Sequence, residues 1–165
     1  MFCLFCAVKI LQKHFFSSFI AVFILFSLAS CSSKLSKREK TEVIIAKARS
    51  YTGTPYKYGG TTGKGMDCSG LLLNSFKAID YNLPRTSAEQ KKVGKRVDDA
   101  EIKKGDLLFF ATSKKRRKVT HVGLVTVVSG GKVTFIHAST SKGVTETRLD
   151  NSYWNKRFIQ ARRVL

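Results

Sequence analysis

The chain has 165 residues, and its formal net charge is +19 at pH 7. If the first 30 residues form a secretory segment, 135 remain, which is enough for one domain with a hydrophobic core and too few for two. We find no internal repeats. The remaining 28 basic and 11 acidic residues give a charge of +17, so the surface is expected to attract polyanions.

The N-terminal segment has the composition of a lipoprotein signal peptide. Lys9 and Lys13 precede an apolar stretch from Phe15 to Ser27, and Leu28-Ala29-Ser30-Cys31 follows it. The stretch is shorter than the roughly 20 residues of a membrane-spanning helix, although an uncleaved membrane anchor stays an alternative. Leu-Ala-Ser-Cys resembles the bacterial lipobox, which implies removal of residues 1–30 and lipidation of Cys31.

A lipidated Cys31 would make residues 31–40 a short polar tether and residues 41–165 the folded domain. We expect an exported, lipid-anchored monomer, and Ser32 after the lipidated cysteine resembles sorting to the outer membrane, with the domain facing the periplasm. Cell wall and lipid head groups are the anionic partners at that location, so no nucleic-acid partner is expected. The densest basic run, Lys114 to Lys118, is either a wall- or membrane-contacting loop or a solvated turn.

The first half of the domain has helical and loop patterns. Residues 39–50 read as an amphipathic helix, and a segment rich in Gly and Pro follows from Tyr51 to Gly60. An apolar run over residues 71–79 reads as a buried helix, with Cys68 at its N-terminus. Thr86 or Ser87 is expected to cap a short helix that ends at Gln90.

The second half has five short segments that are rich in β-branched and aromatic residues. Together they predict an α+β domain, with N-terminal helices packed on a five-stranded antiparallel meander. The predicted strands are Asp106–Ala111, Thr120–Val128, Lys132–Ala138, Val144–Leu149 and Phe158–Val164.

Cys68 has no cysteine partner in the expected mature chain. Cys3 and Cys6 lie in the signal segment, and Cys31 would carry lipid. An unpaired thiol is open to oxidation in an oxidising compartment, so its presence suggests use, although a buried inert cysteine is the alternative. The N-terminus of a helix and a nearby imidazolium are expected to lower the thiol pKa, and free N–H groups there can bind an oxyanion.

His121 and His137 lie on two consecutive predicted strands, so their relative position depends on the turn between them. A three-residue loop over Ser129–Gly131 would place His121 opposite Ser139 and on the same face as His137. A two-residue loop would place the two histidines on opposite faces.

Six short motifs follow one another along the domain. They are Tyr56-Lys57-Tyr58-Gly59-Gly60, Asp67-Cys68-Ser69-Gly70, Pro84-Arg85-Thr86-Ser87-Ala88-Glu89-Gln90, Gly105-Asp106-Leu107-Leu108-Phe109-Phe110, His121-Val122-Gly123-Leu124 and Ile136-His137-Ala138. In this order they resemble the NlpC/p60 cell-wall cysteine peptidases. The resemblance covers nearly all of the domain, from about Ile44 to Leu165, with no departure at the catalytic positions.

The resemblance implies a papain-like core that hydrolyses amide bonds in peptidoglycan stem peptides or cross-links, without metal or other cofactor. It implies that Cys68 is the nucleophile, His121 the general base and acid, and His137 the residue that orients His121. It also implies substrate or oxyanion contacts for four residues near the nucleophile: Tyr56, Asp67, Ser69 and Arg85.

Less specific interpretations remain for these residues. Asp67 can simply cap the helix, Arg85 can be a surface charge, and Tyr56 can belong to the core. Cys68, His121 and His137 together could also be three ligands of a zinc hydrolase, and a non-catalytic wall-binding lipoprotein would need none of them for chemistry.

Overall fold

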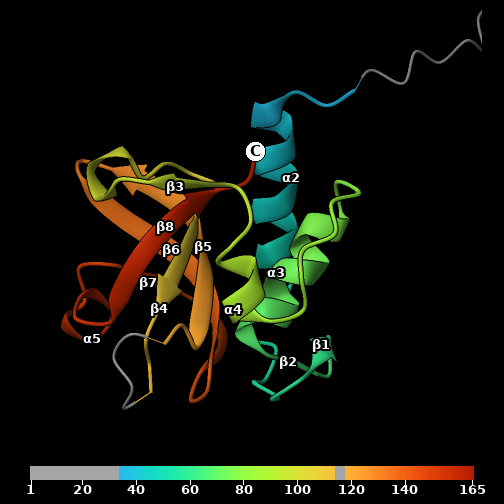
Figure 1. Ribbon diagram of the computed structural model, residues 1–165. Helices are drawn as coiled ribbons and strands as arrows, with labels where there is room; N and C mark the ends of the chain where they lie inside the picture. The colour runs from blue at the N-terminus through green and yellow to red at the C-terminus, as the bar shows by residue number, and fades with distance from the viewer. Residues whose placement is uncertain (1–33, 114–117) are drawn as a thin grey trace, which may run out of the picture. The chain divides into compact units, whose positions relative to one another are not determined.

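The computed structural model describes residues 34–113 and 118–165 of the chain (Figure 1). The predictions for the signal segment, for Cys31 and for most of the basic run Lys114–Lys118 therefore lie outside the described residues. In chain order the elements are α2 (Lys37–Arg49), β1 (Thr61–Thr62), β2 (Gly65–Met66), α3 (Cys68–Lys77), α4 (Ser87–Gln90), β3 (Lys95–Val97), the 3₁₀ helix η1 (Asp99–Glu101), β4 (Leu107–Phe110), β5 (His121–Ser129), β6 (Lys132–Ser139), β7 (Gly143–Arg148), α5 (Ser152–Asn155) and β8 (Phe158–Arg163).

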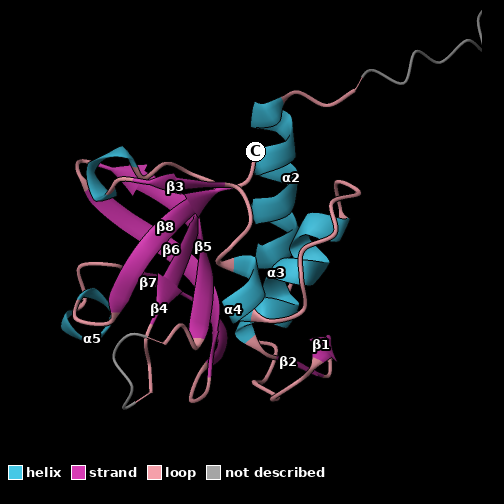
Figure 2. Ribbon diagram, viewed as in Figure 1, coloured by secondary structure: helices cyan, strands magenta, loops and turns pink. Residues whose placement is uncertain are grey.

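The predicted α+β class is confirmed, with α2 and α3 beside an antiparallel sheet (Figure 2). That sheet has six strands in the order β3-β8-β4-β5-β6-β7, and β1 pairs with β2 in a separate small sheet. The predicted count of five strands and the simple meander are therefore wrong. β8 pairs with β4, which a simple meander does not allow. β3 adds a sixth strand at the edge of the sheet beside β8; its sequence, Lys-Arg-Val, is too polar to predict a strand.

Both faces of the sheet are buried at its centre. In β4, Leu107 and Phe109 face the cluster that contains the helices, whereas Leu108 and Phe110 face a second cluster on the other side. This alternation follows from the two-residue period of a strand. All four side chains are inaccessible to solvent, which explains why this segment reads as a continuous apolar run.

Helix α2 begins at Lys37, inside the segment predicted as a tether. Ser36 caps it: its hydroxyl accepts the N–H of Glu39, and the Glu39 carboxylate accepts the N–H of Ser36. The helix packs through buried Ile44 and Ile45. Among the described residues, no helix has the length and apolar character needed to cross a membrane.

β8 is joined to the start of β4 by an ion pair. Arg163 donates two hydrogen bonds of 2.8 Å to Asp106, whose carboxylate is almost completely buried. Asp106 also accepts the backbone N–H of Lys103 at 2.8 Å. The carboxylate is thus fully paired, which is the condition under which a buried charge is tolerated.

The turn of the β5–β6 hairpin decides between the two loop lengths that the sequence left open. Ser129 pairs with Lys132, so the loop has two residues, Gly130 and Gly131, both with positive φ (54° and 73°). Of the two loops considered from the sequence, the structure has the two-residue one, and a regular hairpin with that loop would have placed the two histidines on opposite faces.

A β-bulge at Thr126 shifts the register of β5 by one residue and so brings the two histidines back to one face. Val125 pairs with Phe135 and Val127 with Thr134, so Thr126 is an extra residue in β5. Beyond it, Leu124 pairs with Ile136, and the same register carried onward puts His121 opposite Ser139. The histidines therefore share a face, as predicted, for a different reason.

Gly123 is a position where this hairpin tolerates no side chain. A Cβ there would overlap the ring of Phe135 and lie 3.1 Å from the carbonyl oxygen of Ile136. We expect Gly123→Ala to lower the free energy of unfolding by about 1–3 kcal/mol, the usual range for overpacking. Urea denaturation followed by circular dichroism measures the loss. Gly63→Ala, where a Cβ meets no atom within 4 Å, serves as the control and is expected to be neutral; equal stability of the two variants would contradict the close packing at Gly123.

Candidate active site

Cys68 is the first residue of α3 and is 6% exposed. Asp67 caps this helix by accepting the N–H of Gly70 at 2.7 Å, which fixes the orientation of the first turn. The backbone N–H groups of Val122, Ser69 and Cys68 itself interact with the sulfur. Because Val122 follows His121 directly, the thiol lies against the start of the strand that carries His121.

The two histidines form a hydrogen-bonded pair. Nε2 of His121 lies 3.1 Å from Nδ1 of His137, and Nε2 of His137 lies 3.2 Å from the hydroxyl oxygen of Thr147 on β7. This chain of contacts occupies both nitrogens of His137 and one nitrogen of His121. Nδ1 of His121 is the ring nitrogen that these contacts do not use.

Trp154 on α5 packs against both imidazoles, with ring centroids 5.1 Å from His121 and 4.6 Å from His137. Phe110 and Phe135 complete the apolar surroundings of the pair. Sequence reasoning missed Trp154 because α5 has only four residues and no amphipathic pattern. The one available signal was that it is the single tryptophan of the chain.

Burial controls the ionisation of all three groups. It lowers the pKa of His121 to about 3, with a further lowering by His137, and it lowers the pKa of His137 to about 4. It raises the pKa of Cys68 to about 11, more than the surrounding N–H groups lower it. The N–H groups at the helix start do lower the thiol pKa, as expected, but the net shift is upward because burial outweighs them.

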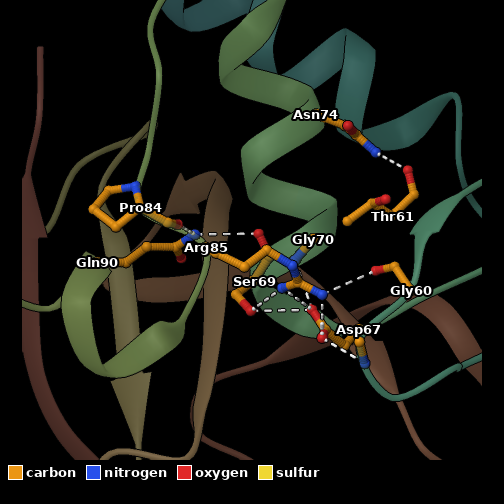
Figure 3. A network of polar contacts seen from close by, with 10 residues as sticks. Gly60, Thr61, Asp67, Ser69, Gly70, Asn74, Pro84, Arg85 and Gln90 are labelled. Carbon is orange, nitrogen blue, oxygen red and sulfur yellow. Dashed lines mark hydrogen bonds and ion pairs between the residues drawn. The ribbon is translucent and has the colours of Figure 1, made fainter.

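Asp67, Ser69 and Arg85 form a polar network at the start of α3 (Figure 3). Arg85 binds Asp67 with both guanidinium nitrogens, at 3.0 and 2.8 Å, and also donates to the Ser69 hydroxyl at 3.0 Å. The Ser69 hydroxyl and the N–H of Gly59 donate to the same carboxylate, each at 3.0 Å. Burial raises the pKa of Asp67, but these hydrogen bonds outweigh it and hold the pKa below its usual value.

Tyr56 and Gln90 complete the surroundings of the helix start. Tyr56 is half-buried, and its backbone forms an isolated parallel β-bridge with Met66. Burial and the proximity of Cys68 and Asp67 raise the pKa of its phenol, so the phenol stays protonated and can donate a hydrogen bond. The buried amide of Gln90 donates to the carbonyl oxygen of Ser69 at 3.1 Å and to that of Pro84 at 2.8 Å. Gln90, which was not among the predicted site residues, thereby ties α4 to the first turn of α3.

A cleft of about 530 Å³ opens beside the histidine pair. His121, His137 and Trp154 form one part of its wall, and Lys142, Asn151 and Tyr153 are also exposed to it. Cys68 is not part of this wall.

The start of α3, which carries Cys68, therefore lies against the start of β5, which carries His121, and His137 contacts His121. Within residues 34–113 and 118–165, no three His, Cys, Asp or Glu side chains are arranged to hold a metal ion. The two histidine nitrogens face one another, which is the arrangement of a hydrogen bond and not of two ligands directed at a common ion.

The motifs of this site belong to a known protein family. The family model described as "NlpC/P60 family" matches residues 53–163, a range that contains all three catalytic candidates. The chain belongs to the NlpC/P60 family. The resemblance inferred from the six motifs is thus confirmed.

Curated relatives and solved structures agree with this assignment. The protein named probable endopeptidase NlpC of Escherichia coli K12 is 44% identical over 117 residues, which cover 70% of this chain and 73% of that protein. Murein DD-endopeptidase MepS/murein LD-carboxypeptidase of the same strain is 40% identical over 116 residues, with 70% of this chain and 58% of that protein covered. The crystal structure of an NlpC/P60 family protein from Bacillus cereus superposes with a TM-score of 0.68 at 31% identity, over 76% of this chain and 40% of that one.

The ion pair at the start of α3 is expected to stabilise this NlpC/P60 domain in a pH-dependent way. Arg85 is 37% exposed, so water screens the pair, and we expect Arg85→Met to lower the free energy of unfolding by about 1 kcal/mol at pH 7. Folding lowers the pKa of Asp67. The stabilisation by the ion pair is therefore fully present above the carboxyl pKa of the unfolded chain, about 3.9, and is lost as the pH falls through the lower pKa of the folded protein. Denaturation curves at several pH values measure the difference in free energy of unfolding between Arg85→Met and the unaltered protein, with exposed Arg96→Met as the matched control. A difference that stays the same below pH 3 would contradict the stabilising role of the ion pair.

The neutral state of the thiol is expected to appear in its reactivity. We expect the rate at which iodoacetamide alkylates Cys68 to rise steadily from pH 5 to pH 9, because the thiol pKa is raised to about 11 and only the thiolate reacts. Mass spectrometry of the peptide that contains Cys68 measures the rate, with glutathione in the same tube as the reference. A rate independent of pH over this interval would instead indicate a preformed thiolate–imidazolium pair.

Proposed function

We propose that this protein is a peptidoglycan endopeptidase that cleaves amide bonds of stem peptides or cross-links with Cys68 as nucleophile. The observation that carries the proposal is the 3.1 Å contact between His121 and His137 beside a thiol at a helix N-terminus. Membership of the NlpC/P60 family and the murein endopeptidase activity in the name of a relative 40% identical support it. The candidate bonds are D-glutamyl to diaminoacid and D-alanyl to diaminoacid.

In the first step the carbonyl carbon of the substrate approaches Sγ of Cys68. His121 takes the thiol proton on Nδ1 as the C–S bond forms, so that no stable thiolate is needed beforehand. The negative charge moves to the carbonyl oxygen, where the N–H groups at the start of α3 and the Tyr56 phenol are candidate donors.

In the second step the imidazolium of His121 gives its proton to the leaving amine, and the C–N bond breaks. His137 supports this step because its contact with Nε2 orients the ring of His121, and Thr147 holds His137 in turn. Water, activated by His121, then hydrolyses the thioester and regenerates the thiol. Every proton in this cycle is exchanged between substrate, water, Cys68 and His121.

The acyl side of the substrate is proposed to bind along Asp67, Ser69 and Arg85. Only the Asp67 carboxylate bears a buried negative charge in this group, and most of its hydrogen-bonding capacity is used within the network. Its main contribution is therefore a fixed polar wall next to the nucleophile.

Two other functions are less well supported. A zinc hydrolase would need the two histidines to point at one ion, whereas their nitrogens point at each other. A wall-binding lipoprotein without catalysis would have no need for a buried thiol, two imidazoles and free helix N–H groups at one point.

The proposed location follows from the first part of the sequence. Removal of residues 1–30 and lipidation of Cys31 would attach a monomeric enzyme to a membrane, with the outer membrane, facing the periplasm, as the preferred one. The basic surface and the run Lys114–Lys118 would then lie close to anionic wall and head groups.

Removal of the nucleophile tests the proposed function. We expect Cys68→Ala to reduce cleavage of purified peptidoglycan by at least about 10³-fold, because no other group can form the acyl intermediate. Mass spectrometry of the released muropeptides measures the activity and identifies the bond.

The control is Ser129→Ala, which replaces an exposed serine at the end of β5, outside the cleft, with alanine and leaves the thiol in place. Both variants are expected to show the circular dichroism spectrum and thermal midpoint of the unaltered protein. Undiminished cleavage by a folded Cys68→Ala variant would exclude the mechanism, and wall binding without cleavage by the unaltered protein would favour the non-catalytic alternative.

A further inference from the structure

We propose that the cleft beside the histidine pair binds a free carboxylate on the leaving-amine side of the scissile bond, with Lys142 as its charged contact. This inference deepens the proposed peptidase function and rests on it for the direction of the substrate. It assigns a specificity-determining role to a residue outside the catalytic group.

The wall of the cleft has the composition of an anion site. Among the described residues that form it, Lys142 is the only one with a permanent charge, and no Asp or Glu contributes. The remainder is rich in hydroxyl groups, which can donate to carboxylate oxygens. Those hydroxyls belong to Thr112, Ser139, Thr140, Ser141, Thr145, Thr147 and Tyr153.

The catalytic geometry determines which part of a substrate enters this cleft. His121 and His137 form part of its wall, whereas Cys68 and Asp67 do not. The amine that leaves must receive its proton from His121, so the leaving part of the substrate must lie on the histidine side of the thiol. The acyl part then lies along the start of α3.

The turn that carries Lys142 is held in place. The Ser139 hydroxyl oxygen accepts the N–H groups of Ser141 and Lys142, each at 3.4 Å. On the far side of the turn, the N–H of Val144 donates to the carbonyl oxygen of Thr54 at 2.9 Å. The backbone of Lys142 is thus fixed relative to the histidines, which lowers the entropy lost when its ammonium group binds an anion.

A carboxylate site at this position distinguishes the two candidate bonds. Where the diaminoacid is a dicarboxylic acid, the carbon that bears the leaving amine of a D-alanyl cross-link also bears a free carboxylate. In a D-glutamyl bond within a stem that continues, the carboxyl group next to the leaving amine is used in the following peptide bond. The cleft therefore favours cross-link cleavage.

The test compares two synthetic peptides that differ only in the leaving-side group, a free carboxylate or a carboxamide. Their affinities are measured by calorimetry for the full-length protein in detergent, carrying Cys68→Ala so that nothing is cleaved. We expect Lys142→Ala to weaken binding of the carboxylate peptide about tenfold, the size of one charge-assisted hydrogen bond at a partly exposed site, and to leave the carboxamide peptide unchanged. Lys142→Arg is expected to retain most of the preference.

The matched control is Lys132→Ala, which removes the same charge from an exposed position at the start of β6, outside the cleft. Equal losses for both peptides, no loss for either, or the same loss in Lys132→Ala would overturn the proposal. Cleavage by the protein with Cys68 restored is measured separately. Preferential binding through Lys142 without any cleavage would refute the peptidase function and still support the carboxylate site.

Discussion

The face of the sheet on which His121 lies depends on one extra residue in β5. Thr126 is the bulged residue, and its hydroxyl donates to the carbonyl oxygen of Thr134 on the neighbouring strand at 3.3 Å. Strand residues alternate between faces, so one register step would turn His121 away from His137. The same step would take Val122 and Leu124 out of the core that they share with the helices. Catalytic geometry and core packing therefore require the same register, and neither can be lost alone.

The site has a charged side and an uncharged side. The charged side is the ion pair of Asp67 and Arg85, and the uncharged side is the pair of imidazoles packed among aromatic rings. Burial and His137 lower the pKa of His121, and the negative charge of Asp67 raises it by a smaller amount. Burial raises the pKa of Cys68, and the charge of Asp67 raises it further. The carboxylate thus disfavours a free thiolate and favours a protonated His121. This combination suits a reaction in which proton transfer accompanies the attack on the carbonyl.

Much of this site was predictable because its chemistry is local in the sequence. The cap of Asp67, the position of Cys68 at the start of α3 and the strand character of β4 to β8 follow from short patterns. Features that depend on distant pairing did not follow. Thr126 is β-branched and looks like any strand residue, β3 is three residues long and charged at two of them, and the return of β8 to β4 leaves no mark in either segment.

The thiol pKa shows a second limit of sequence reasoning. A helix N-terminus lowers the pKa of a cysteine in water, and that part of the expectation was sound. The opposing effect, burial of the sulfur among side chains from β5 and the helices, requires the packed structure. Gln90 was missed for a similar reason: its role comes from contacts with Ser69 and Pro84, made where α4 folds back on α3.

Trp154 has a spectroscopic consequence. It is the only tryptophan in the chain and it packs on both histidines, so all indole fluorescence of the protein originates at the site. Indole emission responds to local polarity, and a protonated imidazole in contact with the ring quenches it. The protein therefore carries an intrinsic optical reporter, through which ligand binding in the cleft and the charge of the histidine pair can be followed in real time without any label.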